Sequence, residues 1–179
     1  MTIYLKRLGN SLKRIAKDLR RLDLFKTDDR DFISSIRFSE NLSADAGEFP
    51  LRFEGTAISE GIHSGRVMYT AEELIKAKDR LLGKTIFINH DTGKKSIGTV
   101  VDVIWNDQNK SIDFVGIIDD NDSAIEIMRE NLNKVSVNTQ FTSWPGIEWT
   151  TATDIDFGEL SLLPNGQADK KAKINGIIK

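Results

Sequence analysis

Alternating apolar and polar residues predict a mainly β-protein from Leu51 onward. Residues 51–58 alternate as a half-buried strand does, and similar strand-like runs continue to residue 163. The runs at 97–105 and 111–118 are separated by a polar turn, which is typical of a hairpin. Short connections between about seven strands predict an α+β, mainly β fold, with a closed or barrel-like, mostly antiparallel sheet.

Helices are predicted at the few places where the spacing of apolar residues lengthens. Thr70-Ala-Glu-Glu73 has the composition of a capping box, and the helix that follows is expected to end at Gly83. Ser123-Ala-Ile-Glu126 predicts a second helix, which runs to about Asn133. We therefore expect two or three helices packed outside the sheet.

The N-terminal segment carries a different pattern. Residues 4–22 place leucine and isoleucine at intervals of three and four, which predicts a helix with one apolar stripe. Residues 1–22 hold seven Lys/Arg and one Asp. The helix could dock on its own domain, pair with another chain, or lie against nucleic acid or anionic lipid.

These patterns divide the chain into four parts. Residues 1–25 form a basic amphipathic helical arm, and residues 26–50 form a polar linker. Residues 51–166 form the β-barrel domain, and the Lys-rich residues 167–179 are expected to be a flexible tail. A length of 179 residues suits one such domain with a proper core.

Composition narrows the possible chemistry. The chain has no cysteine and two histidines, so disulfides, thiolate metal sites and a cysteine nucleophile are excluded, and we expect no metal and no cofactor. The net charge of −2 leaves the body of the chain acidic once the basic arm is set aside, so binding of nucleic acid is not expected. No apolar run reaches the roughly 18–20 residues of a membrane span.

One histidine and one serine stand at strand-like positions. The run Ile86-Phe87-Ile88-Asn89 leads into His90, and Ser136 lies 46 residues later between two valines. A histidine base and a serine nucleophile suit acyl transfer. A surface histidine and the polar face of a strand would give the same pattern, and the Gly-x-Ser-x-Gly turn of other hydrolases is absent.

The order of short motifs adds to this reading. They are Gly55-Thr-Ala-Ile58, Gly61-Ile-His-Ser-Gly65, Tyr69-Thr-Ala-Glu-Glu-Leu74, Leu82-Gly-Lys84, Asn89-His90-Asp91, Ile97-Gly-Thr-Val100, Val135-Ser136-Val137 and Gly158-Glu-Leu-Ser-Leu162. In this order they resemble the prohead protease family of tailed viruses, whose fold is similar to that of the herpesvirus capsid-maturation protease, assemblin. The resemblance covers roughly residues 52–165.

The resemblance implies a serine protease with His90 as general base and Ser136 as nucleophile. A third group should orient His90, and Glu159 is the first candidate for it, with Asp91 and Asp102 as alternatives. The other histidine, His63, falls outside the matching position.

An oxyanion site is expected next to the nucleophile, at Val137 and Asn138. Many members of the family have glycine where this chain has Asn138, and the asparagine side-chain amide could serve as a donor instead. This departure favours an alternative function, a catalytically inactive scaffold or minor capsid structural protein of the same fold.

The resemblance also implies a setting in virus assembly. The enzyme would cleave the major capsid protein or a scaffold protein inside the assembling procapsid, in the host cytoplasm. We expect a homo-oligomer and no membrane association. Self-cleavage could remove the N-terminal arm or the C-terminal tail.

Overall fold

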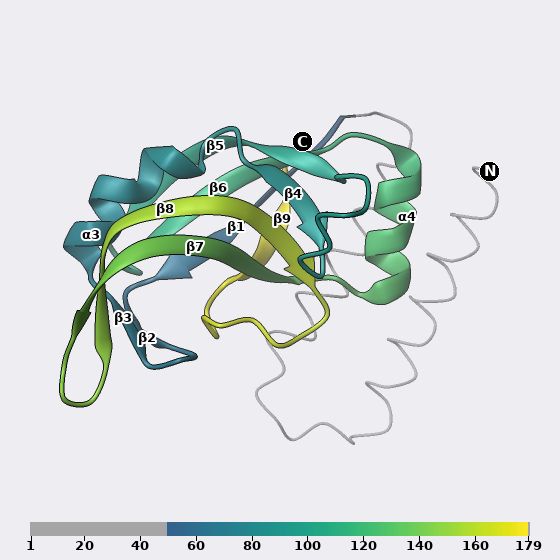
Figure 1. The fold of residues 1–179 in the computed structure, drawn as a ribbon. Coiled ribbons are helices and arrows are strands. Elements are labelled where there is room, and N and C mark those ends of the chain that lie inside the picture. The colour runs from purple at the N-terminus through teal and green to yellow at the C-terminus, as the bar shows by residue number, and fades with distance from the viewer. Residues whose placement is uncertain (1–49, 179) are drawn as a thin grey trace, which may run out of the picture.

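A computed structural model describes residues 50–178, so the expected arm and linker lie outside the described residues. Nine strands form one sheet in the order β2-β3-β8-β4-β5-β6-β1-β9-β7, and β7 also pairs with β8. The seven strands from β8 to β7 therefore close into a barrel (Figure 1). The mainly β, barrel-like fold predicted from the sequence is confirmed. The strands are β1 Leu51–Ser59, β2 Gly61–His63, β3 Val67–Tyr69, β4 Thr85–Ile88, β5 Gly98–Asn106, β6 Ser111–Ile118, β7 Lys134–Pro145, β8 Thr150–Leu163 and β9 Lys173–Ile178.

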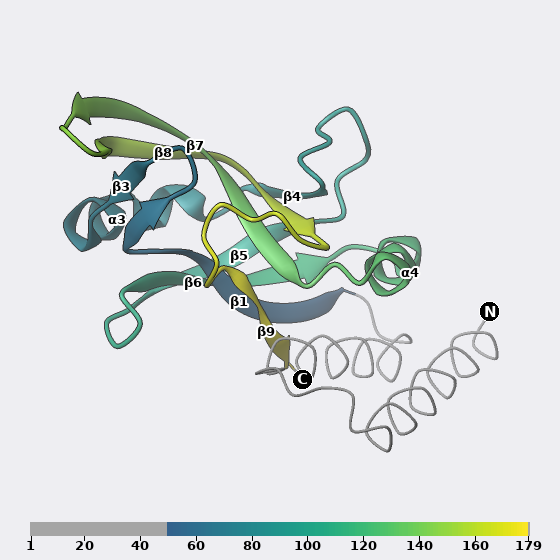
Figure 2. The same ribbon diagram turned by 90° about the horizontal axis from the view of Figure 1, so that it is seen from below.

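Most strand pairs in the barrel are antiparallel. The predicted hairpin is present, because β5 and β6 pair antiparallel from Gly98↔Ile118 to Asn106↔Ser111. Strand β4 is the exception within the barrel, since it runs parallel to β8. The far ends of β7 and β8 extend beyond the barrel as a long hairpin, beside which β2 and β3 lie (Figure 2).

Two short α-helices in residues 50–178 lie at opposite ends of the barrel (Figure 1). Helix α3 (Ala71–Ala77) is capped by Thr70, as predicted, and continues as the 3-10 helix η1 (Lys78–Leu81). Helix α4 (Asn121–Glu130) begins earlier than the sequence suggested. Its N-cap is Asp120, whose carboxylate accepts a hydrogen bond from the Ser123 amide, so Ser123 lies inside the first turn. No helix in the described residues is long and apolar enough to cross a membrane.

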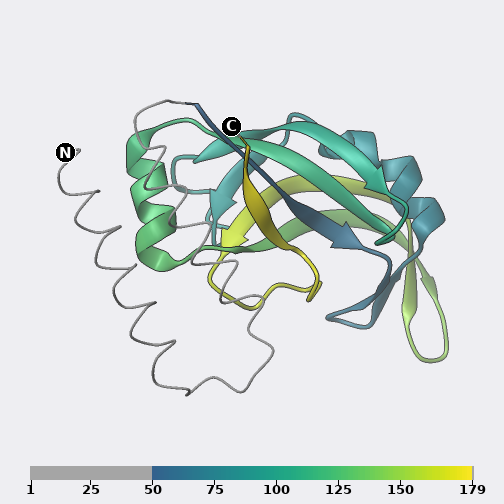
Figure 3. The same ribbon diagram turned by 180° about the vertical axis from the view of Figure 1, so that it is seen from behind.

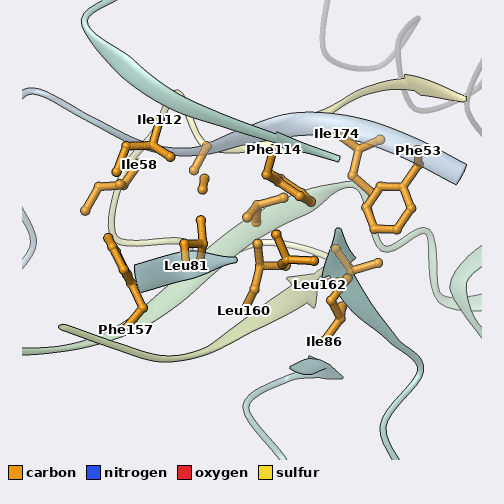
Figure 4. Close-up of a cluster of buried hydrophobic side chains, with 14 of the residues drawn as sticks. Phe53, Ile58, Leu81, Ile86, Ile112, Phe114, Phe157, Leu160, Leu162 and Ile174 are labelled. Carbon is orange, nitrogen blue, oxygen red and sulfur yellow. The ribbon is translucent and has the colours of Figure 1, made fainter. Parts of the chain in front are cut away.

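The barrel is filled by large apolar side chains from all sides (Figure 4). Phe53 and Phe114 meet edge to face with ring centroids 5.7 Å apart, and Leu160 and Leu162 of β8 are fully buried. Gly116 leaves the room that this packing needs, because a Cβ there would lie 2.7 Å from the Phe53 ring. Because side chains alternate along a strand, the buried residues of β8 determine which of its residues face the outside of the barrel.

The C-terminal segment is part of the barrel, and the prediction of a flexible tail is wrong for residues 173–178. Strand β9 pairs with β1 along its length, and with β7 at Lys134↔Lys173 (Figure 3). Ile174 is 3% exposed and belongs to the core. The segment is rich in lysine, but the apolar residues between the lysines supply enough buried surface to hold a strand.

Replacing Ile174 should test this role of β9. Ile174→Ala removes buried methyl groups and should lower the free energy of unfolding by about 2–5 kcal/mol, measured by urea denaturation. The neighbouring Asn175→Ala changes an exposed side chain and should shift stability by less than about 0.5 kcal/mol. Equal midpoints for the two variants would mean that β9 does not contribute to the folded barrel.

Candidate functional site

Four polar residues form a block on the outer face of β7 and β8. Ser136 lies opposite Ser161 in the antiparallel ladder, and Asn138 lies opposite Glu159. Directly opposed residues project from the same face of a sheet, with Cβ atoms about 4.5–5.5 Å apart. Because Val135, Leu160 and Leu162 point into the core, this block faces out of the barrel.

His90 reaches this block from a turn after β4, and not from the strand itself as the sequence suggested. Asn89 and His90 both adopt the left-handed conformation, with φ of 54° and 58°. Such residues cost about 1–2 kcal/mol each outside glycine. Two hydrogen bonds to β8 hold the turn, from the Asn89 amide to the Leu162 carbonyl (3.1 Å) and from the His90 amide to Ser161 Oγ (3.1 Å).

The His90 ring is bound to a buried carboxylate. Its Nδ1 lies 2.6 Å from Glu159 Oε1, and the Glu159 side chain is only 5% exposed. An ionised carboxylate can only accept, so Nδ1 carries the proton and Nε2 is left with its lone pair in the neutral ring. A histidine held in this way can act as a base at Nε2.

Among the three carboxylates considered from the sequence, the structure joins only Glu159 to His90. The Asp91 carboxylate accepts a hydrogen bond from the Gly93 amide and lies 3.5 Å from Lys94 Nζ. Asp102 is exposed on β5, where it bonds the Val103 amide. The two alternatives for the third residue are therefore not supported by the geometry.

Ser136 lies across β8 from the His90 turn. Strand β8 stands between β4 and β7, so an imidazole extending from the end of β4 must pass over β8 to approach Ser136. Ser136 is 9% exposed and makes no hydrogen bond with His90. Two side-chain polar atoms in residues 50–178 are fully buried without a hydrogen-bond partner, and the Ser136 hydroxyl is not one of them. Solvent can therefore reach this hydroxyl.

The two oxyanion candidates differ in the direction of their backbone amides. The Val135 amide donates to the Ala172 carbonyl, on the side of β7 away from β8. The direction of the backbone amides alternates from one residue to the next along a strand. Val137 lies two residues after Val135, so its amide also points away from β8. Strand β9 pairs with β7 only at Lys134, so within residues 50–178 the Val137 amide faces an open strand edge beside Ser136. The Asn138 amide points toward β8, which leaves its exposed side chain as the available donor.

Ser161 belongs to the site, although no role was predicted for it from the sequence. It is fully buried, donates from Oγ to Glu159 Oε2 (2.6 Å), and accepts from the His90 amide. The one signal in the sequence is its position two residues after Glu159, because residues i and i+2 share a face of a strand.

His63 belongs to a separate cluster. Its Nε2 lies 3.8 Å from Asp169 Oδ2, both side chains are less than 10% exposed, and its ring packs on Tyr69 at 4.9 Å between centroids. Asp169 also accepts hydrogen bonds from the amides of Ser59 (2.5 Å) and Lys171 (2.8 Å). The cluster fastens the segment before β9 to β1 and β2, next to a cavity of about 80 Å³ that Ser136 also lines.

Residues 50–178 contain no group of three or more His, Asp or Glu side chains that could hold a metal ion. The comparisons with known proteins add no assignment: no family model matches the chain, and neither does any curated protein.

Protonation of His63 should weaken the fold in mildly acidic solution. Burial lowers the pKa of His63 below its usual 6.5, and the Asp169 carboxylate acts in the opposite direction. The unfolded chain therefore takes up a proton at a higher pH than the folded chain does. The stability that neutral His63 provides is complete above pH 6.5 and is lost as the pH falls through the folded pKa.

This effect can be isolated, since the chain has only two histidines. In a His90→Gln background, the urea midpoint should fall between pH 7.5 and pH 5.5. This fall should be larger in the variant that keeps His63 than in the variant that also carries His63→Gln. Both pH values lie above the usual pKa of carboxyl groups, so most carboxylates stay ionised throughout. An equal loss of stability with and without His63 would contradict the assignment.

Proposed function

We propose that the chain is a serine endopeptidase of virus head maturation, with His90, Ser136 and Glu159 as its catalytic residues. The observation that carries the proposal is the hydrogen bond of 2.6 Å between His90 Nδ1 and the buried Glu159 carboxylate. It leaves Nε2 as a base on the face of the sheet that also carries Ser136.

The proposed reaction begins with His90. Its Nε2 takes the Ser136 proton while Ser136 Oγ attacks the carbonyl carbon of a peptide bond, and Glu159 stabilises the imidazolium that forms. The Val137 amide at the open edge of β7 is suited to donate to the oxyanion, with the Asn138 side chain as a second donor. The imidazolium then protonates the leaving amine, and water attacks the acyl-enzyme in the reverse sequence of proton transfers.

The separation of His90 from Ser136 in the free enzyme is compatible with this reaction. Catalytic hydrogen bonds in unliganded enzymes are often long and tighten only when substrate binds. The His90 side chain is 40% exposed, so its ring has room to approach Ser136.

The setting of the reaction follows from the resemblance of the motifs to prohead proteases. The proposed substrates are the major capsid protein or a scaffold protein, cleaved inside the procapsid in the host cytoplasm. A homo-oligomer and self-cleavage that removes the arm of residues 1–25 are parts of the same proposal.

A serine-directed fluorophosphonate should label the full chain at Ser136, as located by peptide mass spectrometry. Ser136→Ala should abolish labelling, and His90→Ala should slow it by about 10²–10⁴-fold, which is the usual contribution of a general base. Glu159→Gln should also slow it, because the imidazolium loses the carboxylate that stabilises it, whereas the matched variant Asp102→Asn removes an exposed carboxylate and should react at the normal rate. Labelling elsewhere, or at Ser136 with undiminished rate after His90→Ala, would contradict the proposal.

Coexpression with the proposed substrates, the major capsid protein and a scaffold protein, tests which of them is cleaved. The wild-type chain should shorten one of them, and Ser136→Ala should leave both intact. Cleavage that persists with Ser136→Ala would exclude Ser136 as the nucleophile.

Two observations favour the alternative, an inactive scaffold or minor capsid protein of the same fold. Ser136 and His90 are not hydrogen-bonded, and Asn138 stands where the related proteases often have glycine. An inactive protein would leave Ser136 unlabelled and both coexpressed proteins uncut, and it would be retained in assembled particles.

A further inference from the structure

We propose that Ser161 is a positioning residue of this site, which fixes the Glu159 carboxylate and the His90 turn together. The inference rests on the proposed function and adds a fourth residue to it. The Ser161 hydroxyl is hydrogen-bonded to Glu159 and to the His90 amide, so its effect on Ser136 would pass through these two residues.

The first contact orients the carboxylate. Ser161 Oγ donates to Glu159 Oε2 at 2.6 Å, while Glu159 Oε1 lies 2.6 Å from His90 Nδ1. With one oxygen bound to Ser161, the plane of the carboxylate is set and the other oxygen faces His90. A hydrogen bond from a neutral donor to a charged acceptor is stronger than one between neutral groups, and burial at 5% exposure strengthens it further.

The second contact orients the backbone of the base. The same Oγ accepts a hydrogen bond from the His90 amide at 3.1 Å, at a residue whose left-handed backbone is unfavourable for a side chain with a Cβ. One hydroxyl group therefore holds both partners of the His90–Glu159 pair. Loss of this group would release the carboxylate and the turn at once.

The third observation concerns size. Ser161 lies on β8, the strand between the His90 turn and β7, and is directly opposite Ser136. A ring that moves from Glu159 toward Ser136 must cross above this position. A short side chain leaves that path open, and among short side chains only serine also supplies the donor and the acceptor that the two contacts need.

Another buried serine provides a matched control. Ser111 is 1% exposed in β6, and its Oγ donates to Asp113 Oδ1 at 3.0 Å. It therefore has the same arrangement as Ser161, a buried strand serine bound to a carboxylate two residues away. Asp113 has no contact with His90 or Ser136, so Ser111→Ala reproduces the loss of such a bond without affecting the site.

The test measures the second-order rate of fluorophosphonate labelling at Ser136 in the full-length chain. Ser161→Ala should lower this rate by about 10- to 100-fold, as expected for loss of a hydrogen bond to a charged group, whereas Ser111→Ala should leave it unchanged. Circular dichroism and urea midpoints should give similar stabilities for the two variants.

A double-mutant cycle separates positioning from a general loss of structure. In a Glu159→Gln background, Ser161→Ala should lower the rate by a smaller factor than it does in the wild-type chain, because the carboxylate that it orients is gone and only its contact with the His90 amide is left to lose. If the losses from Ser161→Ala and Glu159→Gln multiply, Ser161 does not act through Glu159 and the inference is wrong. An unchanged rate in Ser161→Ala alone would also overturn it.

Ser161→Cys guards against misfolding of the alanine variant. The thiol has nearly the same shape and is a weak donor, so its labelling rate should fall between those of the wild type and Ser161→Ala. A rate at or below that of the alanine variant, in a folded protein, would count against the inference. If the wild-type chain is not labelled at Ser136, the proposed function fails first; if it is labelled in a His90-dependent manner, the Ser161 variants decide this inference alone.

Discussion

The register between β7 and β8 is the constraint on which the site depends. It places Ser136 opposite Ser161 and Asn138 opposite Glu159, and buries the apolar residues between them in the barrel. Because side chains alternate along a strand, a slip of one residue would turn the polar block inward and the core outward. Burial of Leu160 and Leu162 therefore fixes the register, and the register aligns the candidate nucleophile with the orienting carboxylate.

The remaining partner is brought in by a different kind of contact. Strand β4 runs parallel to β8, and the chain then turns through two left-handed residues so that His90 lies over Glu159. Local backbone preference opposes such a turn, and hydrogen bonds to the Leu162 carbonyl and the Ser161 hydroxyl of β8 hold it in place. Strain of this kind is often found at functional sites, where surrounding structure determines the conformation. The position of His90 is thus determined by contacts with β8, although the residue follows β4 in the chain.

The elements that the sequence predicted well are those in which the apolar pattern and the final environment agree. Alternation in residues 51–58 and 154–163 gave β1 and β8, and the chemistry of a helix start gave the Thr70 cap. The errors have physical causes. Apolar residues among the lysines form β9. Asp120, three residues before Ser123, is the N-cap of α4 in place of Ser123. The left-handed conformation of the two residues before Asp91 cannot be read from their residue types. Glu159 was a candidate among three carboxylates, and only pairing across β4, β8 and β7 distinguishes it. The role of Ser161 depends on contacts between distant segments, which no local pattern contains.

The closure of the barrel by β9 has a consequence for the order of folding. The pairing of Arg52 with Ile178 joins the two ends of the described chain, and contacts of such long sequence separation form slowly because a large loop must close first. Residues 134 and 135 of β7, next to Ser136, are held by β9 and the segment before it. A nascent chain in which residues 172 and 173 have not yet emerged cannot make these contacts. The strand that carries Ser136 would therefore reach its final position only after β9 has joined the barrel.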